Sequence, residues 1–242
     1  MDRPYQNPPT ADTQPLRLDQ ALQLLALSGV PDPRGEPGSP VWMQQLIDAL
    51  VDLSSRDALT GLANRRAFQL ALEREIDRVA RSGEPALMLV ADIDHFKRVN
   101  DCFGHAAGDQ VIRAVAAVLT DSVRPMDLVA RVGGEEFAII LPNCPHSFGE
   151  TVAERIRQQV EQTQVDIGNG RALAVSISMG GAFAPQWVRS TPALWLERAD
   201  LQLYAAKAAG RNRVLLEPTA DSFVSHDEKR LLFDSTSFQD FL

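Results

Sequence analysis

A pair of glycines between two β-prone runs places the strongest constraint on how this chain can fold. Gly133 and Gly134 lie between the runs 127–132 and 137–141. Such a pair is the sequence form of a tight β-hairpin, whose turn needs positive φ angles. Glycines also let backbone approach a ligand closely, and adjacent carboxylates attract a cation. Two glutamates follow the pair directly, Glu135 and Glu136. Taken alone, so short a pattern favours a solvated acidic turn over a binding site.

The patterns on either side of the hairpin alternate between helix and strand. The run 86–91 is apolar at every residue, which is typical of a short strand covered on both faces. Because the hairpin interrupts the alternation, the sequence predicts an α/β (α+β) fold with a mixed sheet wrapped by helices. The other expected elements are strands over 173–179, ending at Gly180 and Gly181, and over 212–216; a polar turn over 95–101; and helices over 65–81, 107–121, 147–164 and 192–209, the last with Ala193, Leu196, Ala199, Leu203 and Ala206 toward the core.

Two aspartates, Asp92 and Asp94, follow the buried run. Carboxylates at the end of a buried strand are costly to desolvate, so we expect a cation or a strong hydrogen-bond donor to meet them. As a lone feature, an Asp-x-Asp pair is a structural cap as often as a metal site.

The residues before Arg56 predict a separate helical segment, 1–54, ahead of a main domain over 55–217 and a tail over 218–242. Residues 1–15 are polar and proline-rich, which predicts disorder, and a short helix is expected over 19–27. A second helix carries a coiled-coil-like seam of two heptads, made by Met43, Leu46, Leu50 and Leu53. So short a seam fits a weak dimer and a helix packed on its own domain about equally. The aromatic residues of the tail fit docking on the domain or on a partner.

Composition narrows the class of protein. The 242 residues carry a net charge of −8, which argues against a protein that binds nucleic-acid polymers. The chain lacks a run of about 18 apolar residues and an apolar leader, which predicts a cytoplasmic protein without a membrane span. Its two cysteines, Cys102 and Cys144, are interpreted as small, partly buried apolar residues and not as a disulfide framework.

Five motifs occur in one order along the main domain: 56–66 (RDALTGLANRR), 92–109, 133–137 (GGEEF), 175–181 and 207–211 (KAAGR). Together they resemble the GGDEF-domain diguanylate cyclases. The resemblance implies a central five-stranded sheet wrapped by helices, related to the nucleotidyl-cyclase and ferredoxin-like arrangements. It also implies a reaction that joins two GTP molecules into cyclic di-GMP and releases two pyrophosphates. Glu135 stands where the family name has Asp, a change that keeps the charge.

The resemblance also implies roles for individual residues. A metal site for Mg²⁺ or Mn²⁺ would use Asp92, the carbonyl of Ile93, Glu135 and Glu136, with Asp92 and Glu136 as main ligands and Glu135 nearest the reacting 3′-hydroxyl. Lys97 joins the catalytic set and, with Lys207 and Arg211, supplies positive charge for the β- and γ-phosphates. The residues expected to contact GTP are Asn100 and Asp109 at the guanine edge, Lys207 and Arg211 at the phosphates, and His105, Gly133 and Gly134. The alternatives are helix capping for Asn100 and Asp109 and solvated surface for the basic residues.

A second implied site precedes the hairpin. Arg124 and Asp127 have the family's spacing for a product-binding inhibitory site, with Arg155 as an auxiliary contact. The alternative is an Arg–Asp pair that closes a surface turn.

The expected partners are GTP, cyclic di-GMP, a second copy of the chain and a regulatory protein bound to the N-terminal helical segment. The second copy is needed because one domain offers one GTP site. Two other function classes remain open: an inactive receptor for GTP or cyclic di-GMP, and a scaffold whose N-terminal helices are the working part.

Overall fold

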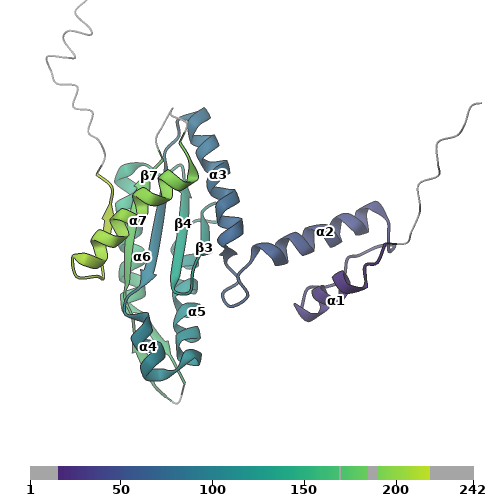
Figure 1. Cartoon of the computed structure of the whole chain (residues 1–242), viewed down its shortest axis with the longest axis horizontal. Coiled ribbons are helices and arrows are strands. Elements are labelled where there is room, and N and C mark those ends of the chain that lie inside the picture. Colours follow the sequence, from purple (N-terminus) through teal and green to yellow (C-terminus); the bar gives the residue numbers. More distant parts are fainter. Residues whose placement is uncertain (1–15, 169, 185–189, 219–242) are drawn as a thin grey trace, which may run out of the picture. The chain divides into compact units, whose positions relative to one another are not determined.

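The computed structural model describes residues 16–168, 170–184 and 190–218 (Figure 1). The chain divides into two compact units, Met1–Arg56 and Asp57–Leu242. The expected disorder of residues 1–15 and the expected docking of the aromatic tail lie outside the described residues. Within these ranges, no helix combines the length and the apolar character needed to cross a membrane.

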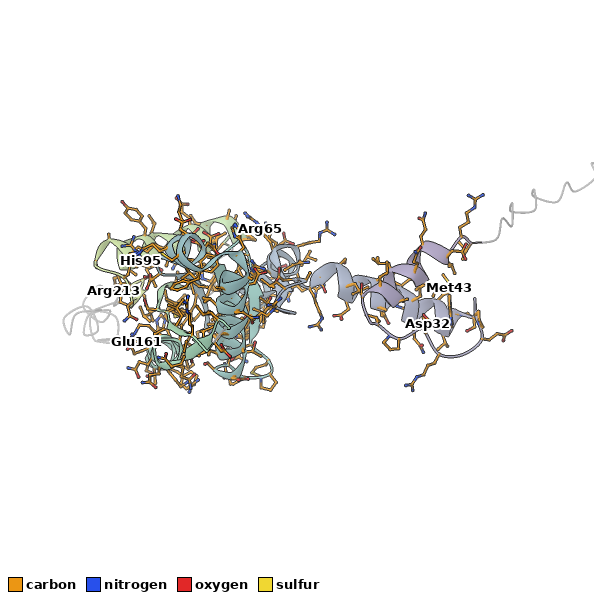
Figure 2. All side chains as sticks on the ribbon, turned by 90° about the horizontal axis from the view of Figure 1, so that it is seen from below. Asp32, Met43, Arg65, His95, Glu161 and Arg213 are labelled. Carbon is orange, nitrogen blue, oxygen red and sulfur yellow. The ribbon has the colours of Figure 1, made fainter. Side chains whose placement is uncertain are left out.

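The N-terminal unit consists of helices α1 (Asp19–Leu27) and α2 (Pro40–Ser55), so the helix expected over 19–27 is confirmed. The Ser39 hydroxyl caps α2 by accepting a hydrogen bond from the Trp42 N–H. Leu25, Trp42 and Leu46 form a small buried core. The seam residues Met43 (labelled in Figure 2), Leu46, Leu50 and Leu53 all belong to this cluster. The seam therefore packs against α1, an arrangement that neither sequence interpretation included.

The second unit is built on a mixed sheet in the order β1-β3-β4-β2-β7-β8. Strand β2 lies near its centre, antiparallel to β4 and β7, whereas β1 and β8 add parallel strands at the two edges. The predicted mixed sheet is confirmed, but its predicted count of five strands is wrong, because a two-residue strand extends one edge. The strands are β1 (Ala63–Asn64), β2 (Ala86–Ile93), β3 (Leu128–Arg131), β4 (Glu136–Pro142), β7 (Ile177–Phe183) and β8 (Val214–Leu216), and a separate pair is β5 (Gln164–Asp166) and β6 (Ala172–Ala174).

Helices cover both faces of this sheet, as the apolar run of β2 predicted. Leu87 and Leu89 face a core that α4, α5 and α6 complete. Met88 and Val90 point to the opposite face, which α3 and α7 cover. In Figure 1, α7 crosses in front of the strands. The helices are α3 (Arg65–Ser82), α4 (Phe96–Phe103), α5 (His105–Asp121), α6 (His146–Gln162) and α7 (Pro192–Ala208).

Two predicted elements are wrong. The polar turn expected over 95–101 is mostly helix α4, because Phe96 and Val99, one turn apart, are buried against the core. His95, labelled in Figure 2, precedes this helix. Its backbone is left-handed, with φ 56°. The strand expected to end at Gly180 and Gly181 instead runs through both glycines as β7.

The backbone of α7 explains the glycine within β7. A Cβ atom on Gly180 would lie 2.1 Å from the backbone nitrogen of Leu203. The helix also turns a different side chain inward from the one predicted. Trp195 is fully buried and donates a 2.8 Å hydrogen bond to the Ala182 carbonyl, whereas Ala193 is exposed.

The cysteine prediction is half correct. Cys144 is buried, and burial raises the pKa of its thiol to about 11. Cys102 is exposed.

Candidate active site

The glycine loop between β3 and β4 brings the predicted acidic residues together. Asp92 on β2 lies directly opposite Glu136 on β4 in the antiparallel register. The Ile93 N–H donates to the Glu135 carbonyl at 3.2 Å, which places Ile93 beside the same loop. Asp92, Ile93, Glu135 and Glu136 thus gather at one end of β2 and β4.

The reason for glycine in this loop differs from the predicted one. Neither Gly133 nor Gly134 has a positive φ angle. The loop runs from the end of β3 at Arg131 to the start of β4 at Glu136, so it is longer than the two-residue turn that would need such angles. A Cβ on Gly133 would instead lie 2.2 Å from the Glu136 Oε2. Glycine at 133 therefore leaves space for the Glu136 carboxylate to fold back over the loop.

Positive and negative groups meet at this end of the sheet. Lys207 reaches over from α7 and places its Nζ 2.8 Å from the Asp92 Oδ2. Burial raises the pKa of Glu135, and so do the charges of Asp92 and Glu136. Burial and the charge of Glu136 likewise raise the pKa of Asp200 on α7. Sequence reasoning missed Asp200, although its position two helical turns before Lys207 places both on one side of α7.

The donor set fits a hard divalent cation by its chemistry. Its side-chain donors, from Asp92, Glu135 and Glu136, are all carboxylate oxygens, which Mg²⁺ and Mn²⁺ prefer. Burial raises the pKa of Glu135, and the charges of Asp92 and Glu136 raise it further; a cation would relieve this repulsion between the carboxylates. In the described residues, no three acidic, histidine or cysteine side chains are assembled around a single point. Lys207 is the cation that contacts Asp92 in this arrangement.

The residues predicted to read guanine come from two successive helices. Asn100 lies on α4 and Asp109 on α5. A Cβ on Gly108 would lie 2.0 Å from the Asn100 Oδ1, so the Asn100 amide lies directly over the turn that carries Asp109. The capping alternative is wrong for both residues, because the N-cap positions of α4 and α5 are His95 and Gly104. Three basic residues predicted to contact GTP have exposed side chains: Lys97, His105 and Arg211.

A long-range pair that sequence reasoning missed holds the loop. Arg131 forms an ion pair with Asp57, with 3.2 Å between Nη1 and Oδ1. The same guanidinium donates to the Gly134 carbonyl at 2.7 Å. The hydroxyl and N–H of Thr60 donate to Asp57 in turn. This arrangement ties the glycine loop to the first turn of the domain. An arginine directly before the loop was the only signal in the sequence.

The residues of the predicted product site form a closed turn. Asp127 accepts hydrogen bonds from the backbone N–H of Arg124 at 2.8 Å and from its guanidinium at 3.1 Å. Arg124 also donates to the Pro142 carbonyl and lies over the ring of Phe148, 5.8 Å from the centroid. Arg155 on α6 donates to the Ser122 carbonyl at 2.8 Å. The Arg124–Asp127 pair thus closes the turn, and product binding there stays a prediction.

Comparisons with known proteins point to one family. The model described as "Diguanylate cyclase, GGDEF domain" matches residues 54–213. The response regulator PleD of Caulobacter vibrioides (strain NA1000 / CB15N) is 41% identical over 175 residues, which cover 72% of this chain but only 38% of PleD. Among solved structures, the GGDEF domain of DgcB from Caulobacter crescentus in complex with c-di-GMP has a TM-score of 0.64 at 41% identity, covering 67% of this chain and 93% of that one. Diguanylate cyclase SiaD from Pseudomonas aeruginosa, in complex with its activator SiaC, has a TM-score of 0.68 at 32% identity, covering 83% of this chain and 73% of that one.

Proposed function

Because this chain belongs to the GGDEF-domain diguanylate cyclase family, we propose that it condenses two molecules of GTP into cyclic di-GMP and releases two pyrophosphates. The observation that carries the proposal is the acidic group at the end of β2 and β4. Asp92 lies opposite Glu136 there. The Nζ of Lys207, on α7, lies 2.8 Å from the Asp92 Oδ2. A protein that only bound a nucleotide would have no need of so much negative charge beside the phosphates.

Each residue of the group has a role in the proposed reaction. Glu135 accepts the proton of the attacking 3′-hydroxyl, because its raised pKa moves it toward the working pH of a general base. Lys207 and Arg211 neutralise the phosphates. Lys97, the last member of the catalytic set, supplies further positive charge for the β- and γ-phosphates. A divalent cation held by Asp92, Glu136 and the Ile93 carbonyl would stabilise the negative charge that develops on the α-phosphate.

We assign guanine selection to Asn100 and Asp109; a Cβ on Gly108, which precedes Asp109, would lie 2.0 Å from the Asn100 Oδ1. A carboxylate accepts the two donors on the edge of guanine, a donor pair that adenine lacks on the matching edge. His105, Gly133 and Gly134 complete the proposed contacts to GTP.

The first test is direct. Incubation with GTP and Mg²⁺ should yield cyclic di-GMP and two pyrophosphates per product, measured by chromatography and a pyrophosphate assay. Asp92→Asn and Glu136→Gln should each lower the rate by about 100-fold or more, because each removes one negative charge from the metal site. The control is Glu197→Gln, an exposed acidic residue on α7, which should keep the wild-type rate. Tight binding of GTP or cyclic di-GMP without any product would favour the receptor alternative.

Product inhibition is the second test. We propose that cyclic di-GMP binds at Arg124, Asp127 and Arg155 and slows the enzyme. Arg124→Ala should shift the inhibition curve to higher cyclic di-GMP concentrations, while the initial rate without product stays similar. Asp127→Asn is preferable to Asp127→Ala, because the amide oxygen can still accept from the Arg124 N–H and close the turn. Arg113→Ala, an exposed arginine on α5, is the control. An unchanged inhibition curve in Arg124→Ala would contradict the proposal.

We also propose that the active form is a homodimer, because the reaction needs two GTP molecules that face each other and each domain supplies one site. Helix α2 has a second apolar stripe besides the seam that packs on α1. Ile47 and Val51, which lie one turn apart, are 47% and 58% exposed. This stripe is the proposed contact between two copies, and a regulatory protein that covers the N-terminal unit would set their alignment. SiaD, to which this chain is similar, has been solved in complex with an activator.

A further inference from the structure

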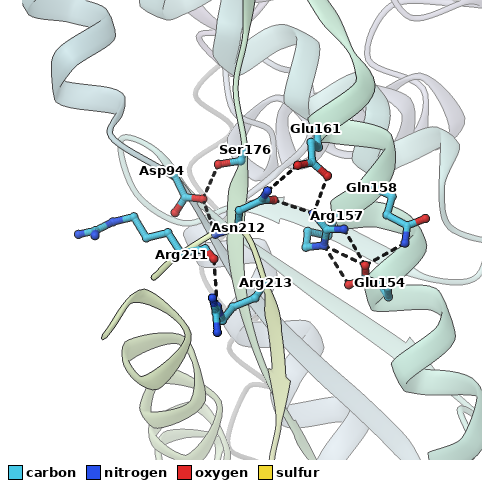
Figure 3. A network of polar contacts seen from close by, with 9 residues as sticks. All are labelled: Asp94, Glu154, Arg157, Gln158, Glu161, Ser176, Arg211, Asn212 and Arg213. Atoms are coloured by element: carbon cyan, nitrogen blue, oxygen red, sulfur yellow. Dashed lines mark hydrogen bonds and ion pairs between the residues drawn. The ribbon is translucent and has the colours of Figure 1, made fainter. Parts of the chain in front are cut away.

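The turn that follows α7 is held from outside by helix α6. The Arg157 Nη1 donates to the Asn212 Oδ1 at 2.7 Å, and the Asn212 Nδ2 donates to the Glu161 Oε1 at 2.6 Å (Figure 3). Arg157 is held in turn by Glu154 at 2.7 Å and by Glu161 at 2.8 Å. Both ends of the Asn212 amide are thus satisfied by charged side chains of α6, and such hydrogen bonds are stronger than neutral ones.

A buried carboxylate holds the same turn from the side of the sheet. The Asn212 N–H donates to the Asp94 Oδ2 at 2.9 Å. Asp94 is 6% exposed and also accepts from the hydroxyls of Ser176, at 2.7 Å, and Ser178, at 2.6 Å. The strong donors that the sequence led us to expect at Asp94 are these three groups. Since Asp94 lies two residues after Asp92, the turn is tied to the strand end that carries the proposed metal site.

The backbone of this turn does not hold its shape by local preference alone. Gly210, Arg211 and Asn212 have φ angles of 113°, 64° and 47°. Left-handed backbone is disfavoured for residues other than glycine, least so for asparagine. Figure 3 shows the Arg211 side chain pointing away from the polar network. Its guanidinium makes no hydrogen bond or ion pair within the described residues, so the direction of this side chain depends on how the turn is anchored.

We propose that Asp94, Arg157 and Asn212 are positioning residues for phosphate recognition, which hold the turn 210–213 so that Arg211 meets the terminal phosphates of GTP. The inference rests on the proposed function for the phosphate role of Arg211. It adds a requirement that the motif 207–211 does not contain: recognition of the triphosphate depends on a helix more than 50 residues earlier in the chain.

The test compares two nucleotides that cannot react, 3′-deoxy-GTP and 3′-deoxy-GMP, by calorimetry with Mg²⁺. Asn212→Gly removes both amide hydrogen bonds, yet keeps the N–H that Asp94 accepts and tolerates the positive φ. Affinity for the triphosphate should fall about tenfold, as expected for the loss of a charge-assisted contact, with affinity for the monophosphate unchanged. Gln158→Ala, which removes a contact to Glu154 but none to Asn212, is the control and should leave both affinities unchanged.

A double-mutant cycle separates positioning from simple damage to the fold. If Asn212 acts through Arg211, then Asn212→Gly should have no further effect on triphosphate affinity in an Arg211→Ala background. Independent, multiplying losses would overturn the proposal. Should Asn212→Gly unfold, Arg157→Lys supplies the same comparison, because a lysine cannot replace the forked contacts of the guanidinium.

The outcomes for the two proposals are distinct. If the wild type makes cyclic di-GMP and Asn212→Gly keeps the full preference for triphosphate over monophosphate, only this inference is wrong. If the wild type makes no cyclic di-GMP but Asn212→Gly loses a preference that the wild type has, the proposed function is wrong and the positioning role stands. A wild type without any preference for the triphosphate would overturn the positioning role.

Discussion

At the scale of single residues, the candidate site combines the burial of Glu135 with repulsion between neighbouring carboxylates. Glu135 is partly buried and lies near Asp92 and Glu136, while Lys207 contacts only Asp92 among them. Such an arrangement stores unfavourable electrostatic energy in the protein without ligand, and a bound cation would release it.

The raised pKa of Glu135 makes stability depend on pH. Burial raises the pKa of Glu135 above its ordinary value of 4.5, with Asp92 and Glu136 adding to the shift. The folded protein therefore holds this proton more tightly than the unfolded chain does. The resulting stability is present below the unfolded pKa and is lost as pH rises through the folded pKa. Glu135→Gln cannot ionise, so in EDTA its melting temperature should rise relative to the wild type between about pH 4 and about pH 7. Glu150→Gln, an exposed residue of α6, is the control. If the melting temperatures of Glu135→Gln and the wild type differ equally at both pH values, folding does not raise the pKa of Glu135.

At the scale of elements, the contact between α7 and β7 sets the position of Lys207. The helix approaches the strand so closely that a Cβ on Gly180 would lie 2.1 Å from the Leu203 nitrogen and 2.4 Å from the Ala199 carbonyl. Lys207 follows Leu203 by about one turn. The glycine in β7 therefore controls how near the lysine comes to Asp92.

Gly180→Ala should test this contact. Because the obstructing atoms are backbone and cannot turn aside, the substitution should lower the free energy of unfolding by about 2 kcal/mol or more, measured by urea titration. It should also weaken GTP binding by moving α7. Gly134→Ala is the control for stability, since a Cβ there meets no atom within 4 Å, and it should change the free energy of unfolding by about 0.5 kcal/mol at most. Equal stability of the two variants would contradict the close approach of α7.

At the scale of the whole molecule, the N-terminal unit offers two different apolar surfaces. Leu46 is 1% exposed and belongs to the core between α1 and α2, whereas Ile47 and Val51 are exposed on the same helix. Substitution of the buried seam would unfold the unit, so only the exposed stripe can test its role in association.

The double variant Ile47→Asp, Val51→Asp should weaken association of the two copies, because it places charges within the proposed contact. The rate per protomer should then fall and depend steeply on protein concentration, while the melting temperature stays near that of the wild type. Gln45→Glu adds a charge elsewhere on α2 and keeps an acceptor for the Arg34 N–H, so it should behave as the wild type. A concentration-independent rate in the double variant would assign the N-terminal unit a purely structural role.

The sequence by itself determined the fold class and the place of the motifs. The apolar run of β2, the helix 19–27 and the loop after Arg131 follow from local periodicity and local chemistry, which neighbouring residues carry. The sequence also predicted that a cation or strong donors would contact Asp92 and Asp94. A buried carboxylate needs such a partner whichever residue supplies it.

Only the tertiary structure decided which groups meet. The partners of Asn212 are Asp94, Arg157 and Glu161. Arg131 likewise meets Asp57 across a long stretch of chain. Helix α4 forms from a polar segment because Phe96 and Val99 find a core to enter. Gly180 is required by a helix that arrives later in the chain. Such contacts arise from the packing of the elements in space, and the local pattern of residues does not predict them.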